Sequence, residues 1–156
     1  MTNILTEVRK ALVKRLETIS TANGYLTNVG SNVKSGWFNE VVKDGDVSAS
    51  GQVVVQKAKA LPPESGRGAL KMRPGFHVIA AIKADLHDYE APIEDIELDL
   101  LSCLCPTDGV FPEWLPDGAP NLIVGAPEPF PPGEGLNATT VLIPVHIISV
   151  VDRLGY

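Results

Sequence analysis

The longest apolar run in the chain, Thr139 to Val151, constrains the fold more than any other stretch. It is rich in β-branched residues, which predicts a strand. Alternation gives it two largely apolar faces, Val141, Ile143, Val145, Ile147 and Val151 on one and Leu142, His146, Ile148 and Val150 on the other. We therefore expect other elements to cover both faces. Because Pro144 has no N–H to give to a ladder, we expect it at a sheet edge or a bulge.

Two stretches have the apolar spacing of amphipathic helices. The first runs from Asn3 to Ser20, and Thr2 or Asn3 can cap its start. The second runs from Pro92 to Leu104 and begins with a proline, which is favoured in the first turn of a helix. The acidic residues of this second helix are expected to face solvent, and they are Glu94, Asp95, Glu97 and Asp99.

Further strands are predicted at Tyr25–Val29, Gln52–Ala60, Phe76–Ala84 and Asn121–Val124. We expect the strands Gln52–Ala60 and Phe76–Ala84 to form a hairpin. Its connection, Leu61 to Pro74, is expected to be a long irregular loop because Leu61–Gly68 contains adjacent prolines and two glycines. Residues 30–46, 105–120 and 127–135 are also predicted to be loops. The expected fold class is α+β, a small mixed or antiparallel sheet with two helices packed on it and long ordered loops, in a single domain spanning residues 1–156.

The bulk properties narrow the classes of function. A formal net charge of −6 argues against a dedicated nucleic-acid binder, because phosphate contacts need clustered Lys and Arg. The start lacks a signal-peptide pattern and no apolar run has membrane-spanning length, so we expect a cytosol-like location and no membrane contact. Cys103 and Cys105 are the only cysteines, and their spacing lacks the second pair of a structural zinc site. We expect reduced thiols, no bound metal and no cofactor.

No pattern of catalytic residues stands out. Seven acidic residues lie between Asp85 and Asp99, but they scatter around a polar helix side, which favours a solvated surface over a metal site. The histidines, His77, His87 and His146, are dispersed, and a lone strand histidine is usually a half-buried packing residue. A Cys–His pair formed in space stays open as an alternative. An enzyme is therefore the weaker hypothesis.

Several sequence segments resemble those of a known protein family. The run Ala11–Ile19 leads into Ala22–Gly30, with a Gly-Tyr-x-Thr turn; the strand Val53–Val55, the helix Pro92–Leu104 and a final strand ending at Val150–Arg153 follow. In these segments, and in the order of its predicted helices and strands, the chain resembles the tail terminator proteins of long-tailed bacteriophages. This family is also described as tail-completion or minor tail protein U-like. The similarity of order covers nearly the whole chain.

The resemblance implies a structural virion protein, assembled in the host cytoplasm and located at the head-proximal end of the tail. Such a subunit forms a hexameric ring on the finished tail tube, stops its polymerisation and offers a surface to the head-side connector protein. Its partners are copies of itself, the tail tube protein and the connector, and DNA passes through the lumen without specific binding. It has no reaction to catalyse. The alternatives are a head–tail connector or tail tube subunit of similar fold, or, from a different class, a small cytoplasmic enzyme.

One cluster of charge is a candidate contact with a partner or with the ring lumen. It consists of Lys57, Lys59, Arg67, Lys71 and Arg73. Glu64 is the only acid among them, in a chain that is otherwise net acidic. A basic surface of this kind attracts DNA phosphates or an acidic partner rim. An ordinary solvated loop is the competing interpretation.

Overall fold

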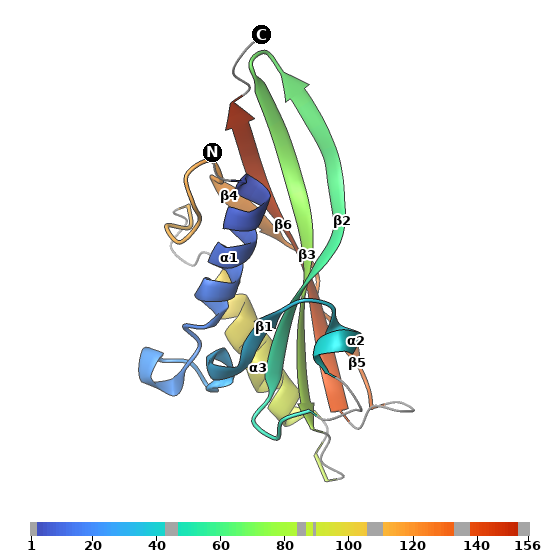
Figure 1. Cartoon of the computed structure of the whole chain (residues 1–156). Coiled ribbons are helices and arrows are strands. Elements are labelled where there is room, and N and C mark those ends of the chain that lie inside the picture. The colour runs from blue at the N-terminus through green and yellow to red at the C-terminus, as the bar shows by residue number, and fades with distance from the viewer. Residues whose placement is uncertain are drawn as a thin grey trace.

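A computed structural model describes residues 3–42, 47–83, 87–88, 90–105, 111–132 and 138–152. Its helices are α1 (Ile4–Leu16), α2 (Phe38–Val41) and α3 (Ala91–Leu104). Its strands are β1 (Val33–Ser35), β2 (Gln52–Gly66), β3 (Ala69–Lys83), β4 (Asn121–Val124), β5 (Glu128–Phe130) and β6 (Ala138–Asp152). Figure 1 shows the long strands side by side, with α1 and α3 on one face of the sheet. The predicted α+β class is confirmed, with six strands in a mixed sheet and three helices.

The sheet is built on three long strands. The order is β1-β2-β3-β6-β4, and β5 also pairs with β6. Strands β2, β3 and β6 have 15 residues each and pair antiparallel, whereas β1 runs parallel to β2. The apolar run that dominates the sequence thus lies inside the sheet, between β3 on one side and the short strands β4 and β5 on the other.

Pro144 lies in an inner strand, so the prediction of a sheet edge is wrong, but the prediction of a bulge is confirmed on the β4–β5 side of β6. Val124 pairs with Val145 and Glu128 with Leu142, so residues 125–127 face only residues 143–144 there. On the other side of β6, Pro144 has a regular partner. It pairs with His77 of β3 in a continuous register. The N–H of Gly125 donates to the Pro144 carbonyl at 2.7 Å, which places that carbonyl on the β4 side. The N and O of an extended residue point to the same side of a strand, so the missing N–H falls in the gap between Val124 and Glu128.

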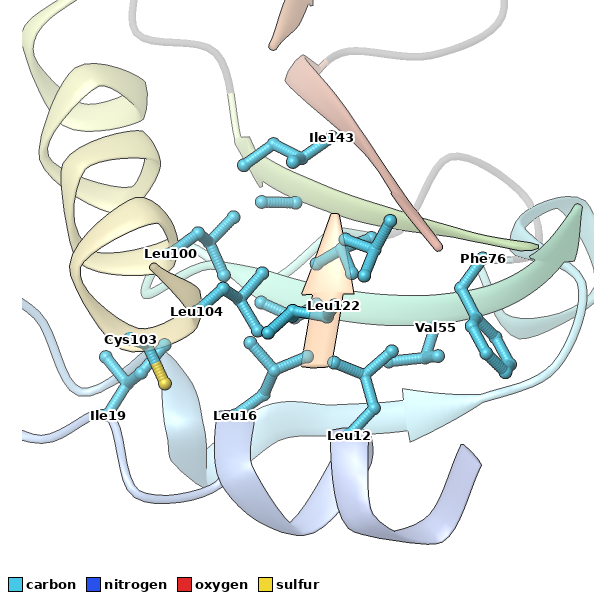
Figure 2. Close-up of a cluster of buried hydrophobic side chains, with 14 of the residues drawn as sticks. Leu12, Leu16, Ile19, Val55, Phe76, Leu100, Cys103, Leu104, Leu122 and Ile143 are labelled. Carbon is cyan, nitrogen blue, oxygen red and sulfur yellow. The ribbon is translucent and has the colours of Figure 1, made fainter. Parts of the chain in front are cut away.

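The hydrophobic core lies between the helices and one face of the sheet. Leu12 and Leu16 of α1 and Leu100 and Leu104 of α3 are fully buried. Figure 2 shows these side chains converging with those of the strands. The sheet residues that meet them include Val53, Val55, Phe76, Val78, Val141, Ile143, Val145 and Ile147. The core therefore uses the face of β6 that begins with Val141, as alternation predicts.

The expectation that both faces of β6 are covered is only partly confirmed. On the second face, Leu142, His146 and Ile148 are half-buried. A smaller cluster covers one end of that face, formed by Val42, Val47, Val54, Ala81 and Ala138, with Phe38 and Val41 packed against it. Near the other end, Ile123 is 42% exposed. The helices thus cover the central part of one face of the sheet, and the other face is partly open.

The predicted strand at Tyr25–Val29 is wrong. That segment runs between two 3-10 turns, Thr21–Asn23 and Val29–Asn32. Its backbone has no ladder partner because the carboxylate of Asp99 accepts the N–H groups of Leu26 and Thr27. A side chain thus satisfies the polar groups that a neighbouring strand would otherwise satisfy.

Short elements occupy two of the stretches predicted to be loops. β1 and α2 lie within residues 30–46, and β5 lies within residues 127–135. Each has three or four residues, too few for a periodic pattern to identify. Residues 111–120 contain no helix or strand, as predicted, and Trp114 and Leu115 pack against the core. Parts of the predicted loops, residues 43–46, 106–110 and 133–137, lie outside the described residues.

Candidate functional site

The candidate basic residues lie on a projecting part of the β2–β3 hairpin, residues 57–73, which we call the arm. Figure 1 shows the arm extending beyond the N-terminal end of α1. The predicted irregular loop from Leu61 to Pro74 is wrong, because both strands continue through it. Only Arg67 and Gly68 connect the last strand pair, Gly66 and Ala69. Gly68 has φ +77°, a left-handed conformation that glycine adopts without strain.

The prolines are tolerated because this part of β2 is an edge. Strand β1 pairs with β2 only as far as Val55, so no described strand lies along the outer side of the arm. A proline at an edge leaves no ladder bond unmade. The register shifts between Ala58 and Leu61, and again between Leu61 and Glu64, which absorbs the irregular backbone. On its inner side the arm is supported by β6, whose Ser149–Asp152 pair with Ala69–Met72.

Gly75 fixes the base of the arm. A Cβ atom at this position would collide with the carbonyl oxygen of Lys59, and it would lie 3.2 Å from that of Ala58. The bulged part of β2 thus lies directly over Gly75. His146 Nε2 lies 3.3 Å from the same Lys59 oxygen, so the half-buried histidine helps to hold the bulge. This agrees with the packing role predicted for a strand histidine.

The structure brings all five basic residues onto the arm but does not place them on one face. Lys57, Lys59 and Arg67 are exposed, whereas Lys71 and Arg73 are half-buried. Lys57 pairs with the core residue Phe76, so it lies on the helix-covered side of the sheet. Lys71 pairs with Val150, which alternation places on the opposite side.

Arg73 differs from the other four basic residues. Its guanidinium donates to Glu64 Oε1 at 3.1 Å and to the carbonyl of Pro62 at 3.3 Å. Arg73 therefore ties β3 to the irregular part of β2. The arm's remaining cations form no salt bridge within the described part of the chain. Lys57, Lys59, Arg67 and Lys71 are thus the ones available to a partner.

The two cysteines lie at the end of α3, where it meets α1. The Cys103 thiol donates to the carbonyl of Arg15 at 3.3 Å, and Arg15 Nε donates back to the Cys103 carbonyl at 3.0 Å. The Arg15 guanidinium lies 6.0 Å from the centre of the Trp114 ring. Burial raises the pKa of the Cys103 thiol, so it stays protonated at neutral pH. Among the described residues, no group of three His, Cys, Asp or Glu side chains is arranged to hold a metal ion.

We expect Cys103 to be unreactive in the native protein, because it is buried and its thiol is protonated. Cys105 is half-buried and should react first with a thiol reagent at neutral pH. In denaturing urea both should react at similar rates, which serves as the control. Equal native rates at the two cysteines would contradict a structural role for Cys103. Replacing both residues with Ala is expected to leave self-assembly intact.

Asp99 is a buried carboxylate that sequence reasoning placed wrongly on the solvent side. It is 2% exposed and accepts hydrogen bonds from the Leu26 N–H (2.9 Å), the Thr27 N–H (2.8 Å) and the Thr27 hydroxyl (2.7 Å). The spacing of the apolar residues along α3 could have predicted that Asp99 is buried. Asp99 follows buried Ile96 by three residues and precedes buried Cys103 by four, so it lies on the apolar stripe of α3.

No family model matches the sequence, and no curated protein matches it either. No helix in the described parts of the chain is long and apolar enough to cross a membrane. The arm is therefore assigned as the candidate site from its geometry and charge alone.

Proposed function

We propose that this chain is a structural virion protein of a long-tailed bacteriophage, a tail terminator. In this role it forms a ring on the tail tube, stops tube polymerisation and presents a surface to the head-side connector protein. The observation that carries the proposal is the arm, a projecting part of the sheet with five basic residues in a chain of net charge −6. The α+β fold supports the proposal too, because it is the fold that the resemblance implies.

The arm suits an assembly role because its shape does not depend on a partner. Strand β6 pairs with its inner side, and the Arg73–Glu64 ion pair closes its irregular segment. A preformed element loses little conformational freedom on binding. The exposed tip, Arg67, is then free to contact the next component of the tail or to line a channel through which DNA passes without specific binding.

The direct test adds the purified protein to polymerising tail tube protein. We expect ring-shaped particles by negative-stain electron microscopy and tubes of limited length with a ring at one end. Monomers alone by light scattering, both with and without tubes, together with tubes of unchanged length, would contradict the proposal. Tubes made of this protein alone would contradict it in favour of a tail tube subunit.

A second test separates ring formation from tail completion. Arg67→Ser combined with Lys71→Ser removes two charges that do not hold the arm together, whereas Arg73 is kept because it binds Glu64. We expect normal rings and a loss of tail completion of about tenfold or more, because interface charges act on association and specificity. Lys10→Ser with Lys14→Ser on exposed positions of α1 is the matched control. Fully normal completion by the arm variant would refute a partner or lumen role for these charges.

A further inference from the structure

A hollow between the arm and the first turns of α1 has the chemistry of a docking site. Its volume is about 290 Å³, and its apolar lining includes Leu5, Leu61, Pro63, Met72, Pro74 and Phe76. Two charged residues line it, Lys57 and Arg73. Arg73 is already paired with Glu64, so Lys57 supplies the uncompensated positive charge. A ligand for this hollow therefore needs an apolar group flanked by acidic ones.

A neighbouring hollow has the opposite charge. Its volume is about 780 Å³, and Glu7, Asp117 and Asp152 line it. An acidic ligand would be repelled there, so the smaller hollow is the one that selects for acids. We call that smaller hollow the arm groove.

The outer face of α3 carries the complementary pattern. Leu98 is 55% exposed, although it is an aliphatic residue in the middle of a helix. Glu94 and Asp95 are exposed and lie one turn earlier, so they flank Leu98 on the same face. The helix contains no Lys or Arg, and none of the salt bridges of the described residues involves these two acids.

The two complementary surfaces cannot meet within one molecule. Helix α3 is held against the sheet by Ile96, Leu100 and Leu104, which are buried in the core, so its outer face points away. Figure 1 shows α3 beside the half of the sheet opposite to the arm's tip. Two different patches that match each other on one chain favour head-to-tail association of copies, which closes into a ring when the rotation fits.

We propose that the arm groove of one copy binds the outer face of α3 of a second copy, with Leu98 in the apolar floor and Glu94 and Asp95 beside Lys57. This inference shares with the proposed function the expectation that the chain binds copies of itself. It assigns the helix-covered side of the arm to the neighbouring subunit and leaves the tip for the next tail component.

Charge reversal on each side tests the pairing. The groove variant is Lys57→Glu, in the groove lining, with Lys59→Glu at an exposed position two residues along β2. The helix variant is Glu94→Lys with Asp95→Lys. Each places like charges together, so we expect each to lower the apparent association constant by about tenfold or more in sedimentation velocity. Combining both pairs of changes in one chain, or mixing the two variants in equal amounts, juxtaposes opposite charges again. Both are expected to restore association to within about threefold of the unaltered protein.

Two further variants keep the result interpretable. Lys10→Glu with Lys14→Glu changes the net charge as the groove variant does, at exposed positions on α1, and should leave association unchanged. Lys near the start of a helix opposes its dipole, so the helix variant is checked for folding by circular dichroism. Leu98→Ser introduces no charge at a position already exposed, and it should also weaken association.

The outcomes separate this inference from the proposed function. Normal association by both reversal variants, or no recovery in their combination, would overturn the groove–helix pairing, as would an unaltered protein that stays monomeric at every concentration. Normal rings made by the reversal variants would overturn the pairing while leaving the terminator proposal intact. Each charge-reversal variant could lose association and the combination recover it, while the unaltered protein never limits tube length. That result would support the pairing and refute the terminator role.

Discussion

Asp99→Ala is expected to lower the free energy of unfolding by about 2–4 kcal/mol, because it removes the buried acceptor of three partly buried hydrogen bonds at once. The N–H groups of Leu26 and Thr27 would then lose their acceptor within the protein. Because this segment links α1 to the first strand of the sheet, we also expect it to lose its fixed conformation. The measurement is the urea midpoint and slope, followed by circular dichroism.

Two variants serve as controls for the Asp99 prediction. Asp95→Ala removes an exposed carboxylate from the same helix and should change stability by less than about 0.5 kcal/mol. Thr27→Val removes the hydroxyl, which donates to Asp99 and accepts from the Val29 N–H at 3.5 Å, so its cost should be about 1–2 kcal/mol. If Asp99→Ala proves no more harmful than Asp95→Ala, the three hydrogen bonds do not anchor this segment.

Gly75→Ala is expected to destabilise the protein by roughly 3 kcal/mol, because the new methyl group would overlap backbone atoms of the β2 bulge. The Lys59 carbonyl cannot rotate away as a flexible side chain would, so the bulge itself must move. Such a shift would also break the contact of Lys59 with His146. We therefore expect faster amide hydrogen exchange in the arm, in addition to a lower urea midpoint.

Gly66→Ala in the same hairpin is the matched control. The nearest atom to its added Cβ is 3.7 Å away, an ordinary van der Waals contact, so its effect should be within about 0.5 kcal/mol. Similar losses of stability for the two variants would argue against a close approach at Gly75. Self-association of Gly75→Ala should fall as well, since the arm groove includes Gly75 in its lining.

Periodicity was sufficient for the elements that are long and face a core. The structure confirms the two predicted long helices as α1 and α3, within a few residues of their predicted ends. It also confirms the central strand β6 and the pairing of β2 with β3. Their repeats of 3.6 or 2 residues extend over many positions, so a few exceptions do not hide the pattern. The short elements β1, α2 and β5 lack that redundancy. They exist because longer neighbours offer them pairing or packing partners.

The arm shows how tertiary context overrides local composition. Pro62 and Pro63 predict irregular structure, and they are compatible with a strand because β1 ends early, which leaves this part of β2 at an edge, and because the register with β3 shifts between Leu61 and Glu64. Nothing in the local sequence shows where a neighbouring strand stops. The sequence shows only that the five basic residues lie close together along the chain. Their support by β6 and the division of Lys57 and Lys71 between two faces depend on the strand pairing.

The sequence by itself determined the α+β class and the two long amphipathic helices, because these depend on local periodicity and composition. Only the tertiary structure decided that Asp99 is an internal acceptor, that Gly75 lies beneath a bulge and that the arm groove faces α1. Each of these joins residues far apart in the chain. A carboxylate on a helix becomes an anchor only when unpaired N–H groups are brought to it, and that depends on how the helices pack on the sheet.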